Sequence, residues 1–282
     1  MNRGMFLGLA AILILAAVGL SRPAEAAGLS LVGVTTEEFT TCPPGLCDVY
    51  VTFPKYTTLV LVLVAMQTAV EPTVQVTTVD WGPQTGTFVK ASPPGADPRT
   101  EVWALANPAV GTGSLYVNRT HTVSFAASAA VLTGSTGAVV ASVSANGGSV
   151  DAQVVLTGAF PQEARTALAF AILGVQPGLG TGAVINANMT QTSYDVVGSG
   201  GGIRHSTGYK TLSDGTDQLG WTLSDTTDWS VVAVSVRSAV NAIDYDSSIG
   251  FDVFWAALFI SILVAGLIMA ARFGRWSGGR GL

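Results

Sequence analysis

The chain has 282 residues, of which 49% are hydrophobic and only 11% are charged. Soluble domains usually carry about a quarter charged residues, so part of this hydrophobicity is expected in membrane-directed segments. Residues 27–252 hold eight Lys and Arg against seventeen Asp and Glu, a net charge of −9. This acidic balance excludes nucleic acid and anionic lipid headgroups as expected partners, because both require a basic surface.

Residues 1–26 have the pattern of a cleavable signal peptide. A basic start at Arg3 precedes an uncharged run from Gly4 to Leu20, and Ala24-Glu25-Ala26 forms a small-x-small triplet. Pro23 ends the apolar helix and leaves an extended segment for the peptidase. We expect cleavage after Ala26, with Ala27 as the alternative position. An uncleaved N-terminal membrane anchor is the competing interpretation.

Both cysteines, Cys42 and Cys47, lie in one short segment, Thr-Cys-Pro-Pro-Gly-Leu-Cys-Asp. Outside the cytosol a close pair predicts a structural disulfide, and Pro43-Pro44-Gly45 supplies the turn. A redox pair and half of a metal site are the alternatives. Redox pairs are usually spaced Cys-x-x-Cys, and further metal ligands are not nearby. A bond that closes so small a loop contributes little stability through chain entropy.

Residues 27–239 are predicted to form an all-β ectodomain, an antiparallel β-sandwich. Short runs rich in Val, Thr, Ile, Leu and aromatic residues alternate with clusters of Gly, Pro, Asn, Ser and Asp. Thr58–Met66 is continuously apolar but too short to span a membrane, so we expect a strand buried on both faces. Thr166–Val175 is a second long apolar run. Leu219–Ser224 and Trp229–Arg237 alternate with period two, and the whole pattern predicts two stacked sheets. The other expected strands are residues 29–35, 49–53, 73–79, 101–105, 114–118, 121–130, 138–144 and 150–157.

Four tryptophans raise the question of sugar binding, since flat exposed rings stack on sugar faces. Trp103 and Trp221 alternate in phase with leucines and are expected in the core. Trp81 ends a strand and Trp229 lies beside a turn. We expect both rings to pack within the sandwich, with partial exposure as the alternative. On that alternative these two are candidate ligand-binding residues.

Two successive turns place carboxylates in pairs, Asp214 with Asp217 and Asp225 with Asp228. Turn carboxylates and carbonyls are ligands that Ca²⁺ takes, although turn chemistry alone also favours Asp at these places. These four are candidate ligand-binding residues. We expect no cofactor and no metal site, with Ca²⁺ as the alternative that these turns leave open.

Asn118 and Asn188 each begin an Asn-x-Thr sequence and are candidate glycosylation sites. The chain has only two histidines, His121 and His205, which we expect at the surface or at strand edges. No clustered metal ligands and no nucleophile elbow are found in the sequence. We therefore expect that the protein is not an enzyme.

Val253–Ala271 is predicted to be a transmembrane helix. These nineteen residues carry no charge, and at about 1.5 Å per residue they span the roughly 30 Å hydrocarbon core. Acidic residues precede the segment up to Asp252, and only arginines follow it, so residues 272–282 form a basic cytoplasmic tail. Residues 240–252 are predicted to form a juxtamembrane stalk. The expected location is a cell membrane, crossed once, with the ectodomain outside.

The order of these segments resembles a β-sandwich module of bacterial and archaeal surface proteins, mostly uncharacterised. The matching features lie within residues 49–237. They are Val76–Gly82, then Glu101–Pro108 with Gly111–Gly113, and last Gly208-Tyr209, Trp221–Ser224 and Asp228–Val236. The resemblance implies a jelly-roll-like sandwich on a cell surface, without catalytic residues. The chain lacks a Leu-Pro-x-Thr-Gly or Pro-Glu-Pro sorting motif before the helix, so retention as a membrane anchor is the simpler expectation.

These features together predict a binding or structural protein displayed on a cell or virion surface, for adhesion or surface assembly. Its expected partners, besides the membrane, are glycans, surface proteins or copies of itself. The alternatives are a lectin-like module using Trp81 or Trp229, and an envelope hydrolase whose site the sequence does not reveal.

Overall fold

The computed structural model describes residues 28–40, 43, 47–68, 72–157, 167–176, 182–186, 189–197, 202–212 and 216–239. The predicted signal peptide, stalk, transmembrane helix and tail lie outside these residues. Within these ranges no helix is long and apolar enough to cross a membrane. All described residues belong to one compact unit of the chain.

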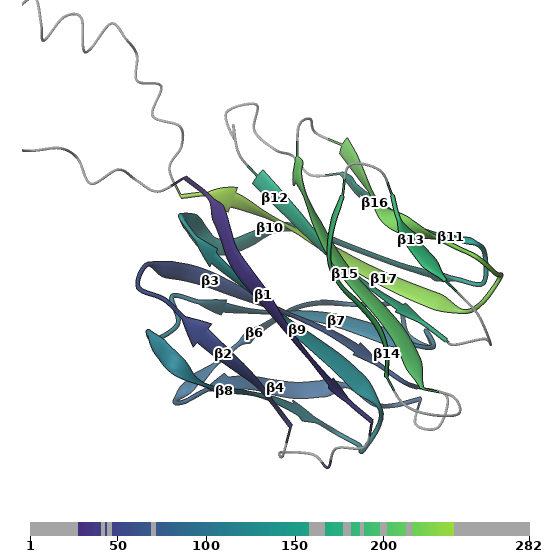
Figure 1. Cartoon of the computed structure of the whole chain (residues 1–282), viewed down its shortest axis with the longest axis horizontal. Coiled ribbons are helices and arrows are strands. Elements are labelled where there is room, and N and C mark those ends of the chain that lie inside the picture. Colours follow the sequence, from purple (N-terminus) through teal and green to yellow (C-terminus); the bar gives the residue numbers. More distant parts are fainter. Residues whose placement is uncertain are drawn as a thin grey trace, which may run out of the picture. The chain divides into compact units, whose positions relative to one another are not determined.

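The described part of the chain is all-β, with antiparallel pairing throughout, which confirms the predicted class (Figure 1). The strands of the first half are β1 Ser30–Phe39, β2 Asp48–Phe53, β3 Thr57–Met66, β4 Val76–Trp81, β5 Gln84–Thr85, β6 Thr87–Ala91, β7 Arg99–Ala106, β8 Gly111–Arg119 and β9 Phe125–Thr133. Those of the second half are β10 Ser135–Gly147, β11 Asp151–Thr157, β12 Ala167–Val175, β13 Ala183–Ile185, β14 Thr190–Val197, β15 Ile203–Leu212, β16 Thr216–Leu223 and β17 Trp229–Ser238.

The two halves repeat one topology. In the first half, sheet A has the order β1-β9-β3-β7-β6 and sheet B the order β2-β8-β4-β5. In the second half, sheet C has the order β10-β17-β12-β15-β14 and sheet D the order β11-β16-β13. When the two-residue strand β5 is left out and each half is numbered from one, both large sheets have the order 1-8-3-6-5 and both small sheets the order 2-7-4. The period-two pattern predicted two stacked sheets, whereas the structure has four.

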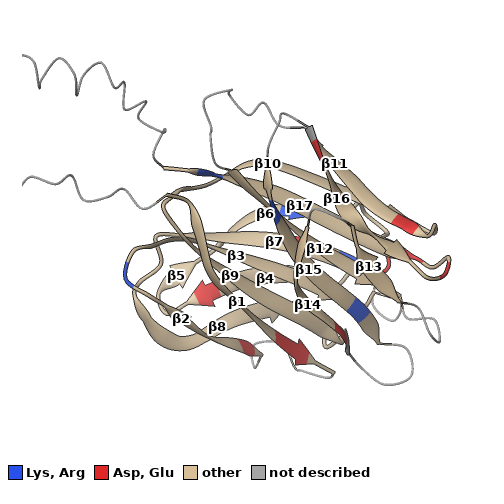
Figure 2. Ribbon diagram, turned by 45° about the horizontal axis from the view of Figure 1, so that its top comes forward, with Lys and Arg blue, Asp and Glu red and all other residues tan. Residues whose placement is uncertain are grey.

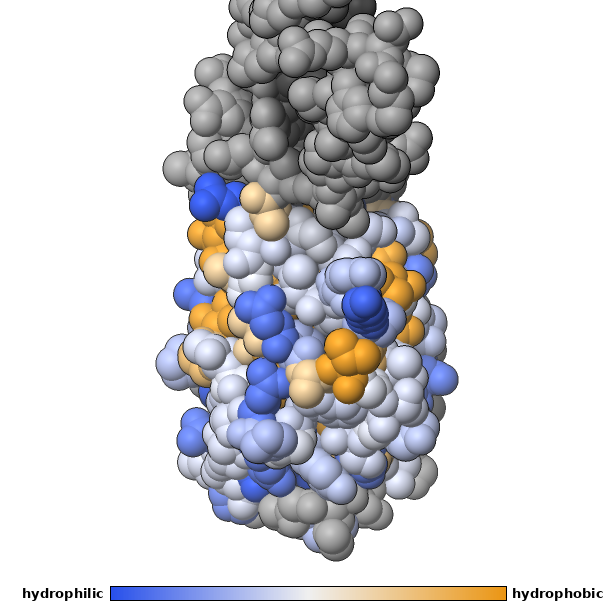
Figure 3. Space-filling view, turned by 90° about the vertical axis from the view of Figure 1, so that its left-hand side faces the viewer, coloured by the Kyte–Doolittle hydropathy of each residue, from blue (hydrophilic) through white to orange (hydrophobic). Residues whose placement is uncertain are grey.

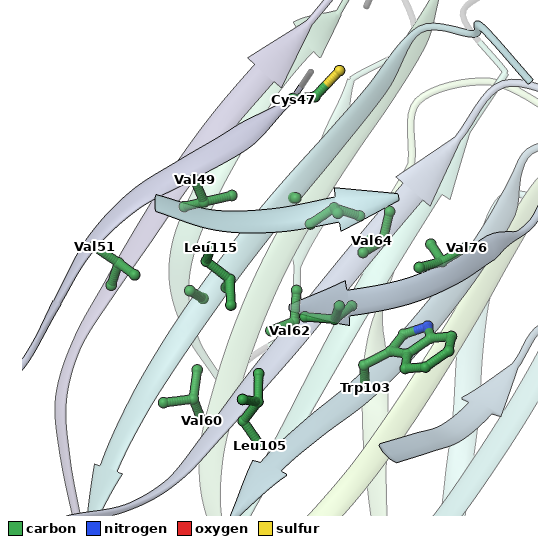
Figure 4. Packing of buried hydrophobic residues seen from close by; sticks show 14 of the residues in the cluster. Cys47, Val49, Val51, Val60, Val62, Val64, Val76, Trp103, Leu105 and Leu115 are labelled. Atoms are coloured by element: carbon green, nitrogen blue, oxygen red, sulfur yellow. The ribbon is translucent and has the colours of Figure 1, made fainter. Parts of the chain in front are cut away.

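Three apolar clusters lie between the sheets and fix their order as B, A, C, D. Figure 4 shows the first cluster, where Val60, Val62 and Val64 of β3 face Val49 and Leu115 of sheet B. The alternate residues of β3 join a second cluster with β12, β15 and β17 of sheet C, and the other face of sheet C joins a third with sheet D. Sheets A and C are thus covered on both faces. This confirms the prediction that the apolar run of β3 is buried on both sides.

Charged residues are few and scattered over the strands and turns (Figure 2). Figure 3 shows one side of the molecule, where apolar residues reach the surface as separate patches among polar ones. Two tyrosines on the outer face of sheet B, Tyr50 and Tyr116, are exposed by 63% and 43%. On the side that Figure 3 shows, the described apolar residues thus do not form one large face.

Candidate functional site

Trp81 and Trp229 are buried, as sandwich packing predicts, and the alternative of partly exposed rings is wrong. Their exposed fractions are 8% and 6%. Each ring packs over a glycine of a neighbouring strand: a Cβ added to Gly113 would lie 3.4 Å from the Trp81 ring, and one added to Gly147 would lie 2.9 Å from the Trp229 ring. The absent side chains make room for the rings. Trp103 is also buried, as predicted.

The described carboxylates of the two acidic turns differ in their surroundings. Asp214 lies outside the described residues, and Asp217 is buried with its Oδ1 accepting a hydrogen bond of 2.7 Å from Lys210 Nζ. Asp225 and Asp228 are exposed. Within the described ranges no group of three or more His, Cys, Asp or Glu side chains is arranged to hold a metal ion. Asp217 is thus held by Lys210, whereas Asp225 and Asp228 lie at the surface.

Asn118 and Cys47 are both engaged by neighbouring side chains. Asn118 Nδ2, the atom to which a glycan would be attached, donates to Thr78 Oγ1 at 2.8 Å and to Asp80 Oδ2 at 2.9 Å. Cys47 is buried, and its Sγ accepts a hydrogen bond of 3.2 Å from Arg119 Nη2. The described part of the chain holds no free cysteine. Cys42 and Asn188 lie outside it, so the disulfide and the second glycosylation site stay predictions.

His205 is buried completely, which corrects the expectation of a surface or strand-edge histidine. Its Nε2 lies 3.7 Å from Glu38 Oε1 of β1, and its backbone pairs with Asp195 of β14. Burial lowers the pKa of His205 to about 4, an effect that Asp195 opposes. The ring is therefore neutral at pH 7, and this contact is not an ion pair. Burial, together with Asp195 and Glu37, raises the pKa of Glu38.

The structure also has a hollow whose lining residues the sequence did not indicate as a site. It has a volume of about 350 Å³ and lies between β4 of sheet B and strands β6 and β7 of sheet A. Ligand pockets usually range from about 300 to 1,000 Å³, so this volume suits a small ligand. The lining residues are Gln75, Val76, Thr77, Phe88, Arg99, Glu101 and Trp103. We call it the Phe88 hollow.

Two aromatic rings form the apolar wall of the Phe88 hollow. Phe88 of β6 pairs with Trp103 of β7, and their ring centroids lie 5.5 Å apart at an angle of 72°. Trp103 is 7% exposed, whereas Phe88 is 49% exposed because β6 is the edge strand of sheet A. The buried indole thus supports a ring that remains accessible from solvent.

A buried carboxylate orients a guanidinium beside these rings. Because strand side chains alternate, Arg99, Glu101 and Trp103 lie on one face of β7. Glu101 is 1% exposed and accepts hydrogen bonds from Arg99 Nε at 2.6 Å, Trp103 Nε1 at 3.1 Å and Val76 N at 3.4 Å. The Arg99 side chain makes no other hydrogen bond with the described residues, so its two terminal nitrogens remain available as donors.

A second hollow, of about 480 Å³, lies on the other side of β6. It is bounded by β6, β7 and β10 of sheet C, and small side chains such as Ala104, Ala106 and Val139 line it. Phe88 contributes to both hollows. The edge strand β6 thus carries one exposed aromatic residue that borders a hollow on each side of the strand.

This arrangement can bind a ligand that needs hydrogen-bond donors beside an apolar ring. It combines an accessible aromatic face, oriented N–H groups and a volume suited to a small ligand. The rings that the sequence offered as ligand-binding candidates, Trp81 and Trp229, are buried, whereas Phe88 is exposed and lines a hollow. Comparisons of the chain with protein-family models, curated proteins and solved structures found no match.

Proposed function

We propose that this chain is a membrane-anchored surface protein that displays two jelly-roll sandwiches outward and mediates adhesion through the Phe88 hollow. The predicted signal peptide and C-terminal helix support the location. The repeated strand orders support the jelly-roll assignment, since each half wraps one large and one small antiparallel sheet around a core. The resemblance to surface-protein modules points the same way.

The observation that carries the binding role is the exposed Phe88 ring beside the oriented guanidinium of Arg99. Ligand sites are mostly apolar, with a few placed polar groups that fix the orientation of the ligand. Burying Glu101 is costly unless its oxygens are fully hydrogen-bonded, and here three donors compensate. The result is a rigid donor group next to an apolar surface, which suits recognition.

The proposal is tested with cells that express the full chain carrying a C-terminal epitope tag. Antibody against the ectodomain should label intact cells, and antibody against the tag should label only permeabilised cells. Expressing cells should be retained on glycan-coated or cell-coated surfaces, and Phe88→Ala should reduce this retention. The matched control is Tyr50→Ala, which removes a more exposed ring on sheet B. This variant should leave the retention of the cells unchanged. Absence of surface labelling, or equal retention of cells with and without the chain, would contradict the proposal.

A further inference from the structure

We infer that the ligand of the Phe88 hollow is a neutral saccharide. In this arrangement one sugar ring packs on Phe88, and its hydroxyl oxygens accept hydrogen bonds from the terminal nitrogens of Arg99. The inference rests on the proposed binding function and names the chemical class of the ligand.

The charges at the hollow select against ionic ligands. Glu101 lies 2.6 Å from Arg99 Nε and offsets the guanidinium charge, so an anion meets a nearly neutral pair. The net charge of −9 over residues 27–252 repels acidic chains as they approach. A cationic ligand finds no accessible acceptor in Glu101, because that carboxylate is 1% exposed and already holds three donors.

The available groups match a polyol with one apolar face. Arg99 supplies donors for hydroxyl oxygens, and on the opposite wall β4 begins beside the exposed side chains of Gln75 and Thr77. Phe88 has no polar atom, so its ring can only serve the C–H face of a sugar. The edge contact with Trp103 already restrains the Phe88 side chain in the free protein. Less side-chain conformational entropy is therefore lost when a ligand binds.

The sizes of the two hollows favour more than one sugar unit. The Phe88 hollow, at about 350 Å³, has room for one unit, and the neighbouring hollow of about 480 Å³ begins on the other side of the same strand. Since Phe88 lines both, a chain of sugars can pass over its ring from one hollow to the other. We therefore expect trisaccharides to bind more tightly than monosaccharides.

The test is a calorimetric titration of the full-length chain, solubilised in a detergent without a sugar headgroup. The probes are cellotriose, xylotriose and mannotriose, with trigalacturonate as the acidic counterpart. At least one neutral trisaccharide should bind, and trigalacturonate should bind at least about tenfold more weakly. Phe88→Ala should weaken neutral binding about tenfold or more, whereas Tyr50→Ala should leave it unchanged.

The guanidinium needs a paired variant, because Arg99→Gln alone would leave Glu101 buried without its cation. The double variant R99Q/E101Q removes both charges and should also lose about tenfold in affinity while its melting temperature shows a folded protein.

Trigalacturonate binding as tightly as the neutral sugars would overturn the inference, as would neutral binding that survives Phe88→Ala. A third outcome is that no neutral probe binds, while displayed chains still mediate adhesion that depends on Phe88. In that case the ligand is not one of these saccharides, so the inference fails and the proposed function stands. If adhesion fails as well, both are wrong.

Discussion

Thr100 Oγ1 and Ser230 Oγ share a buried hydrogen bond of 3.0 Å, although 130 positions separate the two residues in the chain. Thr100 belongs to β7 of sheet A and Ser230 to β17 of sheet C, so this bond joins the two halves. In the same layer, a Cβ added to Gly174 of β12 would lie 2.9 Å from Pro98 Cγ and 3.1 Å from Thr100 Cγ2. The halves therefore meet so closely that a side chain at position 174 would have to displace its neighbours.

Gly174→Ala should lower the stability of the folded ectodomain. The added methyl group overpacks the layer between sheets A and C, which typically costs about 1–3 kcal/mol. Thermal unfolding of the solubilised chain measures the effect. Gly33→Ala in β1 is the control, because a Cβ there would meet nothing within 4 Å. Equal melting temperatures for the two variants would show that the layer adapts freely.

Acidification should destabilise the protein through His205. Its pKa is about 4 when folded and near 6.5 when unfolded, so between these values the unfolded chain binds more protons. The stability gained by keeping the ring neutral is complete above pH 6.5 and is lost as the pH falls toward 4. The full shift corresponds to about 3 kcal/mol. The raised pKa of Glu38 acts in the opposite direction, because this carboxyl favours the folded state when protonated.

Melting temperatures at pH 7 and at pH 4.5 measure this effect. His205→Gln should reduce the loss on acidification, while His121→Gln, at a partly exposed position, should resemble the wild-type chain. An unchanged loss in His205→Gln would assign the acid sensitivity to other groups.

Trp81→Ala should affect stability and not binding. The ring is buried against Phe53 at a centroid distance of 4.3 Å, and its Nε1 donates to the Ala109 carbonyl at 3.0 Å. Removing such a side chain usually costs about 3–5 kcal/mol. Phe88→Ala should show the converse, with a small change in melting temperature and a large change in binding. The hypothesis that Trp81 contacts the ligand would be supported if Trp81→Ala lost binding in protein that is still folded.

The long apolar strands at the centre of the fold, β3 and β12, could be predicted from the sequence. The apolar run of β3 is long and uninterrupted, since both faces of sheet A are covered by other sheets. The repeated topology could not be seen in the sequence, because matching positions of the two halves need only be apolar. For example, Leu61 pairs with Ala130 in sheet A, whereas Phe170 pairs with Val234 in sheet C. Packing of this kind conserves hydrophobicity rather than residue identity.

The candidate site was missed for a local reason. A bulge between Phe88 and Lys90 breaks the period-two pattern of β6, so the strand carrying Phe88 was not predicted. Strand β15 was missed because it buries His205, Ser206 and Thr207, whose polarity indicates a loop. One pattern was available: Arg99, Glu101 and Trp103 follow each other at alternate positions, which places their side chains on one face of a strand.

Hydroxyl-radical footprinting of the full-length chain, with and without a bound neutral trisaccharide, tests the location of the binding site most directly. The free chain exposes Phe88 by 49%, Tyr50 by 63% and Tyr116 by 43%, so all three rings should be oxidised. Our account predicts that the ligand protects Phe88 and leaves both tyrosines unchanged. Protection of Tyr50 and Tyr116 with Phe88 still oxidised would place binding on the outer face of sheet B and contradict it.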